Sequence, residues 1–114
     1  MVALAPDRAP TASLPLRYLR MVPVWGVIAG IVILFQGANI FTSRWAPATI
    51  ALVHVFTLGV LGNAVLGSLL QFLPAVADVR PLALERLGLI LPVLFNVGTA
   101  GLVGGLTLWP ALVP

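Results

Sequence analysis

The stretch ALVHVFTLGVLGNAVLGSLLQFLP, residues 51–74, decides the fold class of this chain. A transmembrane helix needs about 20 mostly apolar residues, because each residue adds about 1.5 Å along the helix axis. The stretch reaches that length without an Asp, Glu, Lys or Arg, and it lacks the alternation of a half-buried strand. It therefore predicts a membrane-spanning helix. Its one ionisable side chain, His54, is the only histidine in the chain.

Two further segments, one on each side of this stretch, are long and apolar enough to cross a membrane. The predicted transmembrane helices span residues 21–41, 48–73 and 87–109. They form a transmembrane domain over residues 21–114, preceded by an extramembrane N-terminal tail over residues 1–20. Proline and charged residues separate the helices, in TSRWAP and in PAVADVRPLALER. The sequence thus predicts an all-α integral membrane protein, a bundle of three transmembrane helices.

The composition of the 114-residue chain excludes several classes of protein. Hydrophobic residues make up 61% of it and charged residues only 8%, whereas a soluble domain carries about 25% charged residues. The chain has no cysteine, which excludes disulfides, iron–sulfur clusters, thiolate zinc sites and covalently attached c-type haem. A basic patch with interleaved aromatic residues is also absent from the sequence, so the expected partner is the lipid bilayer and not nucleic acid.

The arginines predict how the helices are oriented. With a cytoplasmic N-terminus, only Arg44 of the six positively charged residues lies outside. The inner residues are Arg8, Arg17, Arg20, Arg80 and Arg86. Because cytoplasmic segments carry the excess of Arg, we expect a protein of the cytoplasmic (inner) membrane with its C-terminus outside. Trp45 and Trp109 at the outer boundary, and Trp25 near the inner one, are expected to be interfacial aromatic residues.

Small residues form a stripe on each predicted helix and indicate packing faces. The stripes are Gly26, Gly30, Ile33 and Gly37; Gly59, Asn63 and Gly67; and Gly98, Gly101 and Gly105. Small side chains let helix backbones approach closely inside lipid. Since three helices offer few internal surfaces, we also expect a homo-oligomer, most simply a two-fold dimer. The alternative is that the chain docks into a larger complex.

His54 lies on a face of its own helix that differs from the small-residue stripe. At about 100° per residue, that face combines the histidine with medium and large side chains, and the stripe lies opposite. The members of this face are His54, Thr57, Leu58, Leu61, Val65, Ser68 and Phe72. Such a face suits a bulky, flat ligand.

Two interpretations of His54 follow from the residues alone. A buried neutral histidine can form a hydrogen bond that joins helices. Alternatively, an ionisable residue within a span is functional, as an axial haem ligand, a proton carrier or part of a metal site. One histidine without cysteine or an acid at membrane depth cannot supply the three or four ligands of a zinc or copper centre unless several chains converge. Haem needs only one or two axial ligands and an apolar slot, so haem b is the expected cofactor.

The propionate groups of such a haem would lie near the outer boundary of the membrane. His54 follows Trp45 by a distance of roughly 13 Å along a helix, which places the histidine in the outer half of the bilayer. Arg44 is positioned to pair with a propionate carboxylate, beside Trp45. The alternative for both residues is interfacial anchoring. Five amide residues, Gln36, Asn39, Asn63, Gln71 and Asn96, are expected to form hydrogen bonds between helices.

The segment WAPATIALVHVFTLGVLGNAVLGSLLQFLP, residues 45–74, resembles the membrane haemoproteins related to the catalytic subunit of haem–copper oxidases, including NnrS-like proteins. The matching features are Trp45, His54, the pair Leu58 and Gly59, Gly67 and the QFLP ending. LRYLRMVPVWGVIAG also resembles the start of the first helix in such proteins. The second helix of the family carries a histidine that ligates the low-spin haem, toward the outer side. The resemblance therefore implies haem binding by His54, but not oxygen reduction, since the family's later ligand-bearing helices have no counterpart here.

These observations predict a small homo-oligomeric b-type cytochrome of the membrane. A two-fold axis would bring two His54 rings to one shared haem b and give bis-histidine ligation. The function would be electron transfer with a redox partner, or interaction with a diatomic gas. No nucleophile or paired carboxylate accompanies His54, so catalytic residues are not expected and the chain is more an electron carrier than an enzyme on its own. The alternative is a haem-free accessory or scaffold subunit whose His54 is a packing hydrogen bonder.

Overall fold

The computed structural model describes residues 13–77 and 88–112, and every regular element within these ranges is helical. The elements are α1 (Ser13–Leu19), α2 (Met21–Gln36), the 3-10 helix η2 (Gly37–Phe41), α3 (Pro47–His54), the π-helix η3 (Val55–Gly62), α4 (Asn63–Ala77) and α6 (Ile90–Leu112). Residues 1–12 of the predicted tail and Arg80 and Arg86 of the predicted inner loop lie outside the described ranges. The side chain of Trp109 is likewise not described.

Three continuous helical stretches are long and apolar enough to cross a membrane. They are Leu14–Phe41, Pro47–Ala77 and Ile90–Leu108, with 28, 31 and 19 residues. The chain therefore has the character of an integral membrane protein. The first stretch begins inside the segment predicted as a tail, because helical structure already starts at Ser13. α1 also packs on α4, where the Leu19 side chain and the Pro15 carbonyl lie against Gly67.

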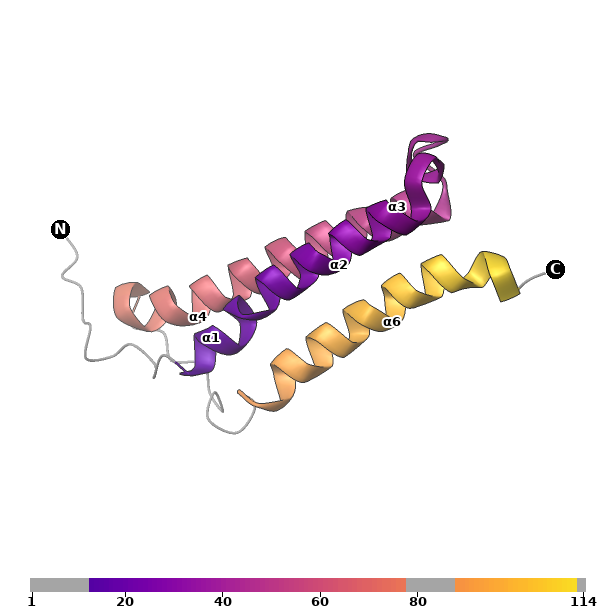
Figure 1. Ribbon diagram of the computed structural model, residues 1–114. Coiled ribbons are helices and arrows are strands. Elements are labelled where there is room, and N and C mark those ends of the chain that lie inside the picture. The colour runs from indigo at the N-terminus through magenta and orange to yellow at the C-terminus, as the bar shows by residue number, and fades with distance from the viewer. Residues whose placement is uncertain (1–12, 78–87, 113–114) are drawn as a thin grey trace.

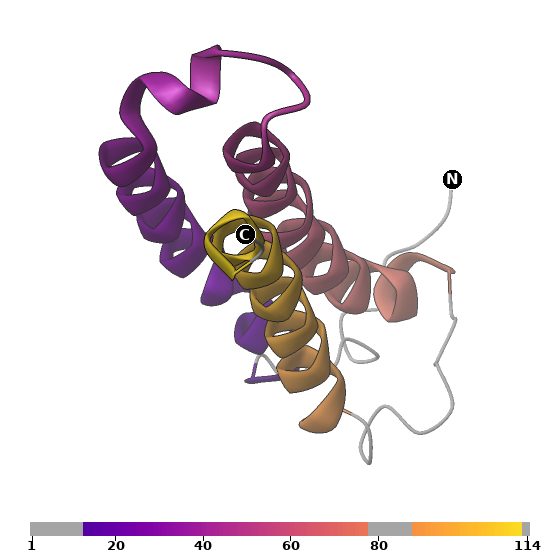
Figure 2. The same cartoon turned by 90° about the vertical axis from the view of Figure 1, so that its right-hand side faces the viewer.

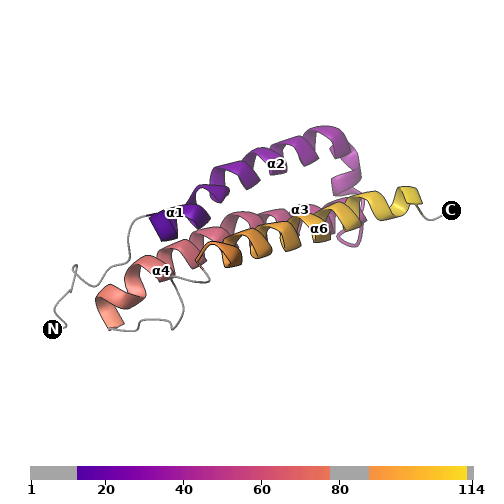
Figure 3. The same ribbon diagram turned by 90° about the horizontal axis from the view of Figure 1, so that it is seen from below.

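The three stretches run side by side in an up-down-up order. In Figure 1, α2 runs from the end where α1 lies to the opposite end, and the chain returns through α3 and α4. α6 then runs along both, in the same direction as α2. Figures 2 and 3 show the three stretches as neighbouring rods with nearly parallel axes. The first turn, between η2 and α3, and the C-terminal end of α6 thus lie at the same end of the bundle.

Proline and glycine set the helix boundaries. Pro23 has no N–H to bond the carbonyl of Leu19, four residues earlier, and the helix is interrupted there, at Arg20 between α1 and α2. Gly37 ends α2 with a φ of 50°, a conformation that glycine adopts easily, and its N–H donates to the Ile33 carbonyl. Pro47 is the first residue of α3, where a missing N–H costs nothing.

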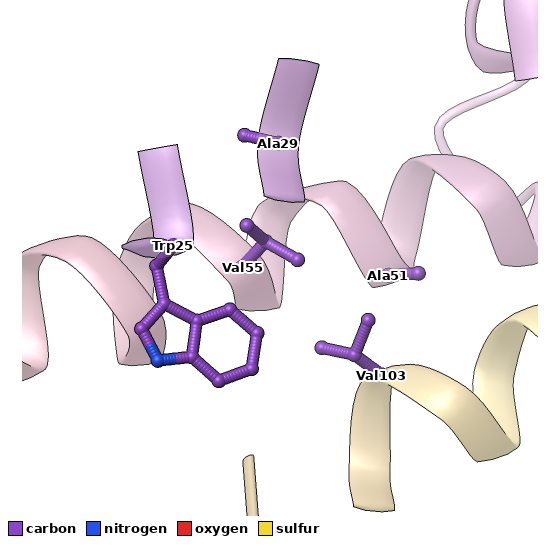
Figure 4. Packing of buried hydrophobic residues seen from close by; sticks show 5 residues of the cluster. All are labelled: Trp25, Ala29, Ala51, Val55 and Val103. Atoms are coloured by element: carbon purple, nitrogen blue, oxygen red, sulfur yellow. The ribbon is translucent and has the colours of Figure 1, made fainter. Parts of the chain in front are cut away.

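The outside of the bundle carries many large apolar side chains, and its inside holds a few buried polar ones. Large apolar side chains such as Leu34, Phe35 and Val97 are exposed, whereas Asn63, Asn96 and Thr99 are buried. Figure 4 shows the apolar part of the core, where Trp25, Ala29, Ala51, Val55 and Val103 from all three stretches meet. This distribution is expected when lipid is the solvent, because lipid-facing side chains must be apolar and polar groups need partners inside.

Only one of the three predicted small-residue stripes packs within the chain. A Cβ atom added to Gly59 would lie 2.5 Å from the indole carbon Cδ2 of Trp25, so the helices are in close contact there. By contrast, a Cβ added to any glycine of the other two stripes would meet nothing within 4 Å. Those glycines are Gly26, Gly30, Gly37, Gly98, Gly101 and Gly105. The first and third stripes therefore do not pack inside this bundle, because both face away from the other helices. Their packing against a second chain stays a prediction.

Candidate functional site

The second membrane stretch changes its helical geometry directly after His54. α3 ends at His54, and the next eight residues, Val55–Gly62, form the π-helix η3 before α4 begins at Asn63. A π-helix bonds each residue to the fifth one along the chain, so each residue advances by less than the ~100° of an α-helix. π-Helical turns are rare and occur frequently at functional sites.

The burial pattern of this stretch follows a period of four residues across the π-helix. The buried residues are Ala51, Val55, Gly59, Asn63 and Gly67. Steps of four also relate the exposed residues Val53, Thr57, Leu61, Val65 and Leu69, and Phe56 is exposed as well. In an ideal α-helix, residues 51 and 67 would differ in direction by about 160°. In the structure both face the interior. Because of the π-helix, the residues at these steps of four all face the neighbouring helices. In a regular α-helix the same residues would point progressively away from them.

The period of four changes the face on which His54 lies. The half-buried residues on its flank are Ile50, His54, Leu58, Gly62 and Leu66, so the prediction that Leu58 is a neighbour fits the structure. Ser68 and Phe72 were predicted to share the face of His54, but they lie on the opposite flank. Leu52 and Val60 belong to that flank as well, at the same spacing of four residues. The predicted opposition of His54 and the Gly59 stripe was also wrong. The two are about a quarter turn apart, because the prediction assumed α-helical geometry throughout.

The flank that carries His54 borders α6. At Gly62, on the same flank, an added Cβ atom would lie 2.8 Å from the ring carbon Cζ of Phe95. His54 is half-buried, two turns farther toward the end of the bundle that holds the first turn. The predicted ligand contacts Thr57 and Leu61 lie on the adjacent, exposed side, where Leu61 is 58% exposed. His54 is therefore at an edge of the bundle, between its interior and its lipid-facing surface.

A hydrogen bond to the backbone determines which nitrogen of His54 can act as a ligand. Nδ1 lies 2.7 Å from the carbonyl oxygen of Ile50, one turn earlier. A carbonyl oxygen only accepts, so Nδ1 carries the proton and donates it. Nε2 then bears the lone pair. This is the arrangement of a metal-ligating histidine, in which the second ring N–H is held by a backbone carbonyl and the ring orientation is fixed.

The two other predicted site residues lie before the start of α3. Arg44 and Trp45 are both exposed, and the Arg44 guanidinium carbon lies 5.3 Å from the centre of the Trp45 ring, a cation–π contact. The turn around them is fixed by Thr49, whose Oγ1 donates to the carbonyl oxygens of Ile40 at 2.6 Å and Ser43 at 3.0 Å. In the part of the chain that the structure describes, no group of three or more His, Cys, Asp or Glu residues could hold a metal ion.

A second polar site, which we call the polar node, joins the three membrane stretches and consists of Trp25, Asn63 and Asn96. Asn63 Nδ2 donates to Asn96 Oδ1 at 2.9 Å, and Asn96 Nδ2 donates to Asn63 Oδ1 at 3.1 Å. Trp25 Nε1 donates to Asn96 Oδ1 at 2.7 Å. The remaining amide hydrogens bind carbonyls of their own helices, those of Gly59 and Pro92. All buried side-chain N and O atoms of the described residues have a partner.

The polar node confirms one prediction and corrects another. The expectation that Asn63 and Asn96 bond between helices is confirmed. Trp25 is not an interfacial residue, because it is only 3% exposed and its indole N–H bonds inside the bundle. No sequence signal distinguishes a buried tryptophan from an interfacial one at this depth. Asn39, by contrast, is exposed, and its backbone carbonyl accepts from Thr42.

Comparison of this chain with protein families, with curated proteins and with solved structures finds no match. The resemblance to haem–copper oxidase relatives therefore stays a prediction that rests on the residues quoted above.

Proposed function

We propose that this protein is a small b-type membrane haemoprotein in which Nε2 of His54 is an axial haem ligand. One observation carries the proposal: the Ile50 carbonyl accepts from Nδ1 at 2.7 Å, which leaves the Nε2 lone pair for a metal. A single imidazole held in this way is enough for haem, whereas zinc and copper centres need more protein ligands.

The surroundings of His54 suit a large apolar ligand. The side chains on its flank are Ile50, Leu58 and Leu66, and the adjacent exposed side carries Leu61 and Val65. A macrocycle against this flank would be covered by the chain on one side only, because the flank lies at an edge of the bundle. A second copy related by a two-fold axis would cover the other side and supply a second His54. This supports the shared, bis-histidine haem b of a homodimer.

The proposed use is electron transfer with a redox partner in the membrane. A haem with two histidine ligands carries electrons, whereas a haem with one open position binds diatomic gases. With a cytoplasmic N-terminus, as the arginine distribution favours, His54 lies in the outer half of the cytoplasmic membrane. Arg44 is exposed at that end of the bundle, where a guanidinium can pair with a propionate carboxylate.

The alternative function, a haem-free scaffold subunit, is favoured by a different observation. His54 already has a hydrogen bond within its own helix, and the polar node holds the three stretches together without any ligand. In this alternative His54 contributes only to local helix structure. The two functions differ in whether Nε2 ever binds iron.

An absorption spectrum of the purified protein decides between them. Protein from haem-sufficient cells should show a Soret band and sharp α and β bands after reduction. His54→Ala should lose these bands and regain part of them with added imidazole. Thr107→Val, a matched control that removes only contacts with two carbonyls of α6 itself, should keep them. A colourless, folded wild-type protein would overturn the haem proposal. One haem per chain, in place of one per two chains, would overturn the shared site.

A further inference from the structure

We infer that the π-helix η3 positions His54, and that Trp25 acts on His54 through this segment. The π-helix accommodates about one residue more than an α-helix of the same number of turns. It therefore sets the direction of His54 relative to Asn63, the member of the polar node on the same helix. This inference goes beyond the proposed function and does not depend on haem.

The angle between His54 and Asn63 shows what the segment does. The two residues are nine positions apart, so a regular α-helix would place them about 180° apart and turn His54 to the lipid side. The observed period of four residues places them about 90° apart, with His54 on the flank beside α6. An α-helix with one residue fewer between them would give about 80°. One extra residue in η3 thus accounts for the observed direction of His54.

Contacts from two other helices hold the π-helical segment in place. The Trp25 ring lies directly against Gly59, so close that a Cβ atom there would be 2.5 Å from Cδ2. Phe95 of α6 fills the space beside Gly62 in the same way, at 2.8 Å. In addition, Asn63 Nδ2 donates to the Gly59 carbonyl at 2.7 Å. Because Trp25 is itself held by Asn96, the polar node fixes the turn of the helix that carries His54.

A deletion experiment tests the extra residue. Deleting Val60 should convert η3 to an α-helix and leave both His54 and Asn63 facing as before, so the protein should stay folded. Deleting Val97 is the matched control. Val97 lies between the buried residues Asn96 and Val103 in a regular α-helix, so its deletion would rotate these two residues relative to each other by about 100°. We expect the first variant to keep most of its thermal stability and the second to lose its folded state. Equal damage by both deletions would overturn the inference.

Spin labels test the direction of position 54 itself. The chain has no cysteine, so a single cysteine at 51, 53, 54, 57, 61 or 65 can carry a nitroxide in vesicles of phosphatidylcholine and phosphatidylglycerol. Collision with oxygen, which dissolves in lipid, should be greatest at 53, 57, 61 and 65, intermediate at 54 and lowest at 51. If residues 55–62 were α-helical and Asn63 stayed in place, the maximum would move to 54. A maximum at 54 in the otherwise unchanged chain would overturn the inference.

Trp25→Ala tests the positioning role of the indole. Removing the ring takes away the contact that holds Gly59. The position with the greatest oxygen collision should then shift from 53 toward 54, while the value at 65, beyond the polar node, should stay unchanged. Trp45→Ala, which removes an exposed indole, should shift neither. A folded Trp25→Ala protein with an unchanged maximum at 53 would remove Trp25 from the proposal. If that variant does not fold, the Val60 deletion still tests the segment.

Discussion

The polar node and His54 share one membrane stretch, through Asn63, but differ in how their polar atoms are hydrogen-bonded. At the node, every side-chain N and O atom is buried and has a partner on another helix or on the backbone. At His54, only Nδ1 has such a partner among the described residues, and the side chain is half-buried at the edge of the bundle. The node thus resembles a structural joint, whereas His54 keeps one ligand atom for something else. Substitutions should separate a stability role from a binding role.

The largest effect on stability is expected at the polar node. Asn96→Leu removes the partners of both Asn63 and Trp25. An unsatisfied buried polar group costs about 1–3 kcal/mol, and measured helix–helix hydrogen bonds in membranes average about 0.6 kcal/mol. We expect a loss of about 2 kcal/mol in the free energy of unfolding. Titration with dodecyl sulfate in mixed micelles, followed by far-ultraviolet circular dichroism, measures it.

The double substitution Asn63→Leu with Asn96→Leu sharpens this expectation. It leaves only the Trp25 N–H without a partner, so it should cost less than Asn96→Leu alone. If the loss in the double variant equalled the sum of the losses in Asn63→Leu and Asn96→Leu, the two amides would not act as a pair.

Overpacking at the π-helix should have the next largest effect. Gly59→Ala forces the new methyl group into the Trp25 ring, and overpacking of this kind costs about 1–3 kcal/mol. Gly101→Ala is the control, because nothing lies within 4 Å of its added Cβ atom, and a helix with Ala in place of Gly is stabilised by about 1 kcal/mol. In the same dodecyl sulfate titration, the unfolding midpoint should therefore fall for Gly59→Ala and rise for Gly101→Ala. If Gly101→Ala were as damaging as Gly59→Ala, the exposed face of α6 would have a partner.

The smallest effect on stability is expected at His54 itself. His54→Ala loses one hydrogen bond to a carbonyl of its own helix, which is worth about 1 kcal/mol or less. The haem-free protein should keep its unfolding midpoint nearly unchanged, while the absorption bands disappear. A loss of stability as large as that of Asn96→Leu would instead mean that His54, like the polar node, holds the helices together.

Apolar length and punctuation were enough to predict the three helices. Residues 51–74 form a membrane-length helix because a helix bonds the polar N–H and C=O groups of an apolar segment within the segment itself, as lipid requires. Asn63 and Asn96 were also predictable, since a buried amide inside a span needs a partner. These features depend on local composition, which the sequence displays directly.

The direction of His54 was not predictable in the same way. The sequence of residues 55–62 looks like any apolar helix, and the π-helix depends on contacts from Trp25 and Phe95, which lie on other helices. An angle of about 100° per residue therefore accumulates an error across this segment. Trp25 was misread for a related reason: its depth in the membrane is visible in the sequence, but not whether it faces lipid or the interior.

The exposed glycines of α6 have a consequence for how the protein reaches its folded state. Gly98, Gly101, Gly104 and Gly105 have open space where a side chain would be, and each glycine lowers helix propensity in water by about 1 kcal/mol relative to Ala. Such a segment would be a poor helix as it emerges from the ribosome. In hydrocarbon the balance reverses, because an unbonded peptide group costs several kcal/mol. α6 is therefore a helix that forms on entering the bilayer, so membrane insertion and secondary-structure formation are one step for this helix.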